Sequence, residues 1–209
     1  MSNIIEKLNW RYATKKFDTK KLSDEKLDIL LESLRLSASS FGLQTWKFIL
    51  VENTEIREKL VPASWGQQQV KDASHLLVFA RPEKIDEKDV DVFITSIAEQ
   101  RGVTTDSLAE YKAFISGFMS KMDEDQKAVW MSRQIYLALG NLLTVAAIED
   151  VDTCPMEGFE PDKYDEILGL SEKGLKSVVV CPIGYRHADD KYSEIKKVRF
   201  SKEDIFITI

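Results

Sequence analysis

Two clusters of basic residues could bind an anion, one near each end of this acidic protein. The first cluster is RYATKKFD at 11–18, and the second is KKVR at 196–199. The whole chain has 29 basic and 35 acidic residues, which gives a net charge of −6. Arginine offers a bidentate fork to phosphate and lysine a point charge, so the two clusters could meet at one anionic ligand. The alternative is a pair of solvated patches, since charge runs usually face water.

A turn at 154–159, CPMEGF, is the next candidate. Between a proline and a glycine, backbone N–H groups can approach a flat ligand where a side chain would obstruct it. Proline and glycine close together also mark ordinary loops, so the turn alone does not define a site.

Other kinds of active site lack the residues they need. Cys154 and Cys181 have no CxxC or Cys/His ligand spacing, and His75 and His187 are the only histidines. No metal site, and no nucleophilic triad that depends on histidine, is therefore expected. We expect His75 to be a hydrogen-bonded structural residue, His187 to be solvated, and both cysteines to serve packing. The negative net charge argues against nucleic acid as a partner.

The composition indicates a globular protein rather than a disordered or membrane protein. The chain has 209 residues, 44% of them hydrophobic and 31% charged. Its longest apolar stretch, 136–148, falls short of the roughly 20 residues of a membrane span. The start, MSNIIEKLN, has no basic region followed by a long apolar core. We therefore expect a cytoplasmic protein without a membrane segment.

The spacing of apolar residues predicts the elements that position these candidates. A helix begins after Ser23, because leucines follow at 27, 30, 31 and 34, the stripe of an amphipathic helix. Three apolar runs predict strands, WKFILV at 46–51, HLLVFA at 75–80 and SVVVCPI at 177–183. The last two are nearly continuous, which is typical of strands covered by helices on both faces.

Helical patterns fill most of the region between the second and third of these strands. Two helices are expected within 83–121 and a long, mostly buried helix over 123–149, with Trp130, Gln134, Leu137 and Asn141 along one face. The tail 192–209 begins basic and ends in IFITI, which could add a strand or wrap onto a partner subunit. No linker or repeat divides the chain, so we expect one α+β domain over 1–209.

The order of these segments resembles the nitroreductase family of flavin-dependent oxidoreductases. The resemblance covers nearly the whole chain, and the collinear order of the pieces is more specific than any one of them. It implies an α+β fold with a central, mostly antiparallel sheet flanked by helices, an intertwined homodimer, and FMN at two interface sites. The matching pieces are RYATKKFD at 11–18, SASSFGLQTWKFILV at 37–51, KDASHLLVF at 71–79, WMSRQIYLALGNLLTVAA at 130–147, PMEGF at 155–159 and KKVR at 196–199.

By this resemblance the two basic clusters belong to one FMN site. Arg11, Lys197 and Arg199 would hold the phosphate, which carries close to two negative charges. Lys15 would lie near the N1/O2 edge of the isoalloxazine, where a fixed cation stabilises the reduced flavin. Tyr12 and Ala13 belong to the same segment, and Ala13 replaces a serine that is common in the family.

The resemblance also implies contacts from other segments and from the second subunit. Gln134 would reach the flavin from the long helix, although its amide could instead cap a backbone group. Gln67 and Gln69 would hydrogen-bond the pyrimidine edge or the ribityl chain. Ser39, Ser40 and Gly42 would come from the other subunit. Along one flavin face would lie Pro155, Met156, Glu157 and Gly158, with the Glu157 or Gly158 N–H toward N5.

The predicted activity follows from the cofactor, and no side chain is predicted to be catalytic. The resemblance implies an FMN-dependent NAD(P)H oxidoreductase that passes two electrons by ping-pong hydride transfer to nitroaromatics, quinones or related acceptors. No GxGxxG follows a strand, so NADH or NADPH is expected to dock transiently on the flavin. Residues 83–121 would shape the acceptor pocket, with Phe114 or Phe118 as lining or as core. A flavin or dihydropteridine reductase and a non-catalytic flavin-binding protein remain alternatives.

Overall fold

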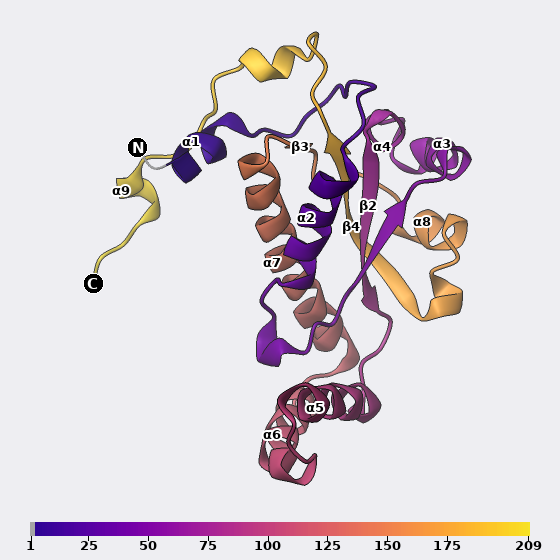
Figure 1. The fold of residues 1–209 in the computed structure, drawn as a ribbon, viewed down its shortest axis with the longest axis vertical. Helices are drawn as coiled ribbons and strands as arrows, with labels where there is room; N and C mark the ends of the chain where they lie inside the picture. Colours follow the sequence, from indigo (N-terminus) through magenta and orange to yellow (C-terminus); the bar gives the residue numbers. More distant parts are fainter. Residues whose placement is uncertain (1–2) are drawn as a thin grey trace.

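The computed structural model describes residues 3–209, and within them one antiparallel sheet of four strands lies between two sets of helices (Figure 1). The strand order is β1-β2-β4-β3, and the two central strands are buried along most of their length. The predicted α+β fold and antiparallel sheet are therefore confirmed. The strands are β1 Lys47–Val51, β2 His75–Pro82, β3 Asp152–Thr153 and β4 Leu175–Gly184.

The helices confirm the main helical predictions. The helix expected after Ser23 is α2, and Ser23 caps it by accepting a hydrogen bond from the Lys26 N–H. The two helices expected in 83–121 are α5 and α6, and the long helix of 123–149 is α7. Among the described residues, no helix combines the length and apolar character that a membrane span requires. The helices are α1 Asn3–Trp10, α2 Asp24–Arg35, α3 Thr54–Ala63, α4 Gln69–Asp72, α5 Glu87–Arg101, α6 Ala109–Met119, α7 Glu124–Ile148, α8 Pro161–Ile167 and α9 Lys202–Ile205, with short 3₁₀ turns η1 Ser40–Gly42, η2 Asp106–Leu108, η3 Ser171–Lys173 and η4 Lys191–Glu194.

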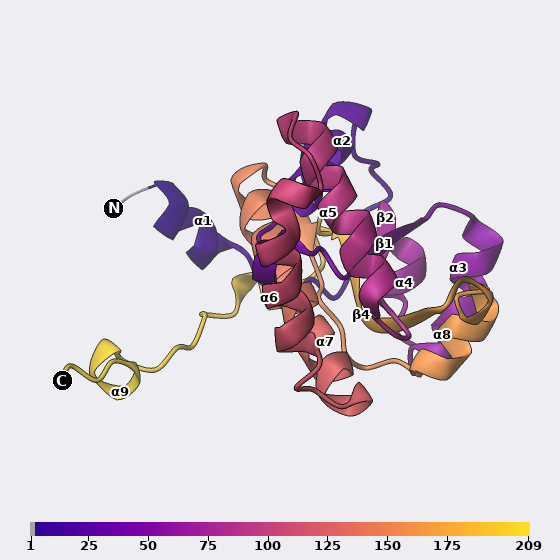
Figure 2. The same ribbon diagram turned by 90° about the horizontal axis from the view of Figure 1, so that it is seen from below.

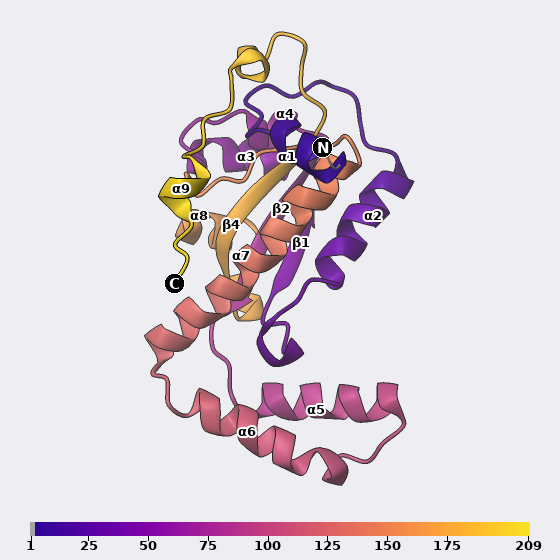
Figure 3. The ribbon, with the colours of Figure 1, turned by 90° about the vertical axis from the view of Figure 1, so that its left-hand side faces the viewer.

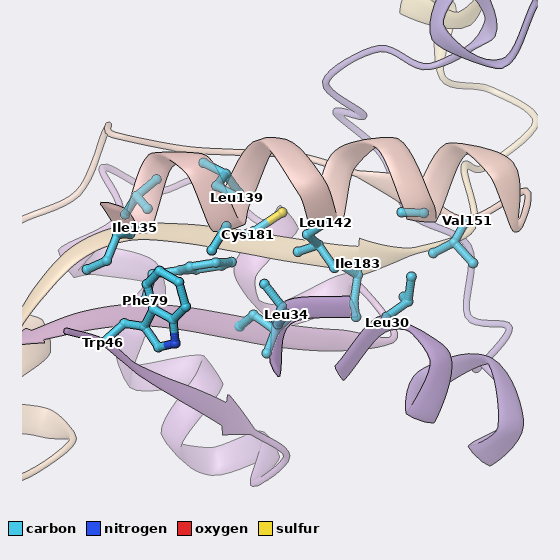
Figure 4. Close-up of a cluster of buried hydrophobic side chains, with 14 of the residues drawn as sticks. Leu30, Leu34, Trp46, Phe79, Ile135, Leu139, Leu142, Val151, Cys181 and Ile183 are labelled. Carbon is cyan, nitrogen blue, oxygen red and sulfur yellow. The ribbon is translucent and has the colours of Figure 1, made fainter. Parts of the chain in front are cut away.

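The sheet buries a hydrophobic cluster on each face. Because side chains alternate along a strand, Leu77 and Phe79 of β2 meet α2 and α7 on one face (Figure 4). Leu76 and Val78 meet α3, α4 and α8 on the other face. Burial on both faces explains the nearly continuous apolar run at 75–80. Each fully buried side chain of this size contributes about 1.5–3 kcal/mol to the free energy of folding.

Helices α5 and α6 form a pair beyond the end of the sheet, against the N-terminal part of α7 (Figure 3). They enclose a third cluster, which contains Ile94, Ile115 and Met131. The pair sits next to η1, so it borders the segment that carries Ser40 and Gly42.

Helix α7 is less buried than the sequence predicts. Its buried stripe is centred on Ile135, Ala138 and Leu142. Of the predicted face, Trp130 and Gln134 are buried, but Leu137 is 57% exposed, and Val129, Tyr136 and Ile148 are exposed as well. The prediction of a mostly buried helix is therefore wrong for the described chain, because no element of it covers the outer side of α7.

The C-terminal tail leaves the body of the molecule (Figure 2). Within residues 185–209 the structure has α9 but no strand, so the tail adds no strand to its own sheet. Ile207 is 88% exposed, and Phe206 and Ile205 are also exposed. The apolar sequence IFITI therefore has no partner surface within residues 3–209.

We expect the cap of α7 to contribute measurably to stability. Asp123 accepts a hydrogen bond from the Gln126 N–H, and the Gln126 side chain accepts one from the Asp123 N–H. Asp123→Ala should lower the free energy of unfolding by about 1 kcal/mol in urea titrations. Asp125→Ala is the matched control, since it removes the same charge from the first turn but no cap. Equal losses in the two variants would contradict the capping role.

Candidate functional site

The two basic clusters meet at one cavity of about 390 Å³. Arg11, Tyr12, Ala13 and Lys15 line it from the start of the chain, and Lys196, Lys197 and Arg199 line it from the end. They meet because the segment after η4 returns to the end of α1 (Figure 1). The interpretation as two unrelated patches is therefore wrong. What the cavity binds stays a prediction.

Lys197 joins the two ends of the chain. Its Nζ donates to the Leu8 carbonyl at 2.5 Å and to the Arg11 carbonyl. These carbonyls lie at the C-terminal end of α1, where backbone acceptors lack helical partners and cations are favoured. Burial, followed by the charges of Arg11 and Arg199, lowers the pKa of Lys197.

Arg11 has a buried donor without a hydrogen-bond acceptor in the described chain. Its Nε is buried and has no acceptor within residues 3–209. Burial and the neighbouring Arg199 charge lower the pKa of Arg11, and no carboxylate among the described residues pairs with Arg11, Lys197 or Arg199. An orphaned guanidinium edge among repelling cations is satisfied by an anion with several acceptor oxygens. The residues present therefore fit a phosphate monoester.

Two buried carboxylates hold the first basic segment in place. Asp190 accepts hydrogen bonds from the Tyr12 hydroxyl (3.0 Å) and from the Lys15 and Lys16 N–H groups (2.8 and 3.1 Å). Asp152 accepts from Arg186 Nε at 2.9 Å and from the Arg186 N–H at 2.8 Å. Burial opposes ionisation of Asp190, but the backbone N–H groups outweigh it and keep the pKa of Asp190 below its ordinary value.

Arg186 supports the same segment through aromatic contacts. Its guanidinium lies 4.1 Å from the ring centre of Trp10 and 4.6 Å from that of Tyr12. The sequence assigned no role to Asp152, Arg186 or Asp190. No motif marks them, because their partners lie more than thirty residues away along the chain and become neighbours only in the fold.

Lys15 links the basic cavity to the turn at 154–159. Its Nζ lies 3.8 Å from Cys154 Sγ. The segment runs beside Thr153, whose carbonyl accepts the Thr14 N–H at 3.2 Å. Burial raises the pKa of Cys154 and Cys181, and both thiols are buried, as expected for packing residues.

The turn is held on several sides and leaves two backbone donors free. The Met156 N–H donates to Val180 at 2.8 Å, and Gln67 Nε2 donates to the Gly158 carbonyl at 2.8 Å. Within residues 3–209 the Glu157 and Gly158 N–H groups donate to no acceptor. A Cβ at Gly158 would lie 3.0 Å from the Trp65 ring, so only glycine fits without a shift. Gln67 therefore orients the turn within this chain, and its predicted contact with the cofactor stays a prediction.

A side-chain hydrogen bond from Tyr136 connects the turn to α7. Its hydroxyl is hydrogen bonded to Glu157 Oε1. Burial and this bond raise the pKa of Tyr136 to about 12, so the phenol stays protonated and donates near neutral pH. The sequence did not single out Tyr136.

Ser39, Ser40 and Gly42, expected to serve the other subunit, and Gln134 of the long helix are not among the lining residues of the basic cavity. Gln134 Oε1 accepts the Ser40 N–H at 2.8 Å and Gln134 Nε2 donates to the Trp130 carbonyl at 3.1 Å, so within this chain the amide caps backbone groups. Gly42 lines a separate cavity of about 440 Å³.

Gln69 is buried at the start of α4, and a buried arginine fixes that helix. Arg57 donates to the carbonyls of Val70 (2.8 Å), Ala73 (2.6 Å) and Ser74 (3.1 Å). Gln69 does not line the basic cavity. The structure thus shows how its helix is held, and the predicted role of Gln69 stays a prediction.

An aromatic cluster lies beside the Gly42 cavity. Phe41, at a positive φ of 60°, contacts Phe114 and Phe118 with ring centres 5.8 and 5.1 Å apart. Phe114 is 64% exposed, so it is not a core residue of this chain.

The histidines lie outside these features. Ser74 Oγ and His75 Nδ1 are 3.0 Å apart, and burial lowers the pKa of His75, in keeping with the predicted structural role. His187 is partly exposed and its Nδ1 accepts the Asp189 N–H at 3.0 Å. Across residues 3–209, no three side chains of His, Cys, Asp or Glu come together as a metal ion would need.

Comparison with known proteins shows the family. Residues 8–185 match the model of the nitroreductase family. A Staphylococcus epidermidis protein that bears the name NAD(P)H nitroreductase SERP2086 is 39% identical, over 97% of this chain and 94% of the relative. The major NAD(P)H-flavin oxidoreductase of Aliivibrio fischeri is 35% identical, over 99% of this chain and 98% of the relative. The chain belongs to the nitroreductase family.

A solved structure shows the same fold. The Exiguobacterium sibiricum protein crystallised in complex with FMN, described as a nitroreductase, superposes with a TM-score of 0.83 at 23% identity. The match covers 100% of this chain and 98% of that one. The nitroreductase-like fold expected from the sequence is therefore confirmed.

We expect inorganic phosphate to stabilise the protein through the basic cavity. At equal ionic strength, the melting temperature should rise more in phosphate than in chloride, because an anion that binds only the folded state stabilises it. Arg199→Gln should reduce this difference, and in chloride it should melt at or above the wild-type temperature because a repelling charge is gone. Lys191→Gln, which changes an exposed cation outside the cavity lining, corrects for the general effect of phosphate on hydration. An identical phosphate response in both variants would rule out the cavity as the anion site.

Proposed function

We propose that this protein is an FMN-dependent NAD(P)H oxidoreductase that passes two electrons to nitroaromatics, quinones or related acceptors. The observation that carries the proposal is the convergence of Arg11, Lys197 and Arg199 on one cavity, with Arg11 Nε unpaired. The names of the relatives and the FMN in the E. sibiricum structure support it. In this proposal residues 1–209 form one flavin-binding domain, and the enzyme works in the cytoplasm.

The basic cavity would hold the FMN phosphate. Each charge-assisted hydrogen bond to it contributes roughly 1.5–3 kcal/mol before desolvation is counted. The charge of the phosphate would also relieve the repulsion between Arg11 and Arg199. Lys197 contributes its charge while it keeps the end of α1 in place.

The residues around the turn would orient the ring system. Lys15 supplies a cation beside Cys154, and the free N–H groups of Glu157 and Gly158 supply donors at the turn. Bound FMN would supply a ring that accepts a hydride and passes two electrons on. The chain's own task is then binding, orientation and electrostatics, which agrees with the absence of a predicted catalytic side chain.

The electron donor and the electron acceptor would bind in turn at the same place beside the flavin, one in each half of the cycle. NADH or NADPH would dock transiently and leave before the acceptor enters, which gives ping-pong kinetics. A flavin reductase is the second candidate, because the A. fischeri relative is named an NAD(P)H-flavin oxidoreductase.

A homodimer completes the proposed site. Exposed apolar residues lie on α7, on α1 and in the tail, and exposed apolar surface of this kind is typical of a subunit interface. They include Leu137, Ile148, Ile4 and the apolar residues of 205–209. Ser39, Ser40, Gly42 and Gln134 lie away from the basic cavity of their own chain. In the dimer they would contribute to the cavity of the partner, and the tail would wrap onto it.

An anaerobic reduction experiment tests the function. The purified protein should be yellow, and NADH or NADPH should bleach it, after which menadione or nitrofurazone should restore the colour. Arg11→Ala, purified in parallel, should be colourless. A protein that takes up no FMN refutes the proposal, and one that binds FMN but is bleached by neither nicotinamide is the non-catalytic flavin-binding alternative. Values of kcat/KM for menadione, nitrofurazone, free FMN and dihydropteridine separate the two reductase classes.

Light scattering during gel filtration tests the dimer. The wild-type protein should have twice the chain mass. Replacement of 205–209 by a Gly/Ser sequence of equal length should weaken both dimerisation and FMN binding, because the apolar contacts of the tail are lost. A wild-type monomer that binds FMN tightly would contradict the shared site.

A further inference from the structure

Asp190 lies between the two segments that form the basic cavity. It is 3% exposed, and its carboxylate accepts four hydrogen bonds, from the Tyr12 hydroxyl and from the N–H groups of Lys15, Lys16 and Tyr192. A carboxylate has about four acceptor positions, so this one is nearly saturated. Three of the four donors belong to the first basic segment, and the fourth belongs to η4.

The backbone around Asp190 ties the same two segments together. The His187 N–H donates to the Lys16 carbonyl at 2.9 Å, and the Asp190 N–H donates to the His187 carbonyl at 2.9 Å. Asp190 also caps η4, since its carboxylate accepts the Tyr192 N–H at 3.1 Å. The chain then continues from η4 to Lys197 and Arg199.

We propose that Asp190 is a positioning residue for the phosphate-binding half of the cofactor site. Its carboxylate fixes the segment of Arg11, Tyr12 and Lys15 relative to the segment of Lys197 and Arg199. Without it, the Lys15 and Lys16 N–H groups and the Tyr12 hydroxyl lose their acceptor, and the two segments lose three of the hydrogen bonds that connect them. This inference rests on the proposed function, because it names the residue that holds the proposed phosphate cavity together.

Charge alone predicts the opposite effect. Asp190 places a negative charge beside a cavity proposed to take a dianion, so removing that charge should tighten anion binding if only electrostatics mattered. Positioning predicts that the same change weakens binding. The sign of the effect therefore separates the two explanations.

Asp189 is a matched control. It carries the same charge one residue earlier, its side chain is 72% exposed, and it forms an ion pair with Lys16 Nζ at 3.0 Å. It accepts no backbone N–H from the first basic segment. Asp189→Asn therefore removes a nearby charge and its exposed ion pair, and it leaves the hydrogen bonds from the first basic segment to Asp190 intact.

The experiment compares FMN with riboflavin, which lacks the phosphate, on cofactor-free protein. Dissociation constants come from quenching of flavin fluorescence, and melting of each apoprotein is recorded alongside. Asp190→Asn should weaken FMN binding by about tenfold or more and riboflavin binding by less than about threefold. Asp189→Asn should leave the ratio of the two constants within about twofold or raise the preference for FMN. An unchanged or increased FMN preference in Asp190→Asn overturns the inference.

A second variant keeps the test valid if Asp190→Asn does not fold. Asp190→Glu keeps the charge and moves the carboxylate by one methylene. Positioning predicts a lower preference for FMN over riboflavin in this variant, whereas charge alone predicts no change in that preference. An unchanged ratio in this variant also overturns the inference. If the wild-type protein binds neither flavin, the proposed function itself is refuted. If both Asp190 variants keep the wild-type preference for FMN over riboflavin, only the role of Asp190 is refuted.

Discussion

The repulsion among Arg11, Lys197 and Arg199 is the constraint on which the site depends. These cations lie around one cavity without a paired carboxylate in the described chain, and burial followed by the neighbouring charges lowers the pKa of Arg11 and Lys197. Such an arrangement persists only if the rest of the fold holds it. Asp190 fixes the first segment, and Lys197 itself bonds to the end of α1. In the proposed function, an anion with two charges would offset this repulsion.

The sheet explains why the two chain ends can meet at all. The first segment pairs with the end of β3 through Ala13 and with the residues after β4 through Phe17 and Arg186. Because β4 is buried on both faces, its end is a rigid point from which Arg186 and Asp190 project. The same strand pins Met156 of the turn. One strand thus positions both the anion cavity and the turn.

Local signals in the sequence were sufficient for the elements but not for their supports. Ser23 and Asp123 act as caps within three residues, and the run at 75–80 reports burial on both faces, so each could be predicted from neighbours alone. Asp190 and Arg186 could not, because a carboxylate bonded to distant N–H groups looks like any surface acid in the sequence. The outer side of α7 was mistaken for a buried face because an apolar pattern in the sequence does not show whether another part of the chain covers it.

The position of Gln134 connects the two proposals about binding and assembly. Its amide orders Ser40 at η1, and neither residue lines the basic cavity of the same chain. In the proposed dimer, each site would therefore draw on two chains. A ligand bound at such a site binds the dimer better than the monomer, and linkage then requires that the ligand strengthens the dimer by the same factor. In the proposed dimer the exposed apolar tail would supply contact area, and a bound anion would offset the positive charge within each cavity. Cofactor binding and dimerisation are therefore expected to be one coupled equilibrium.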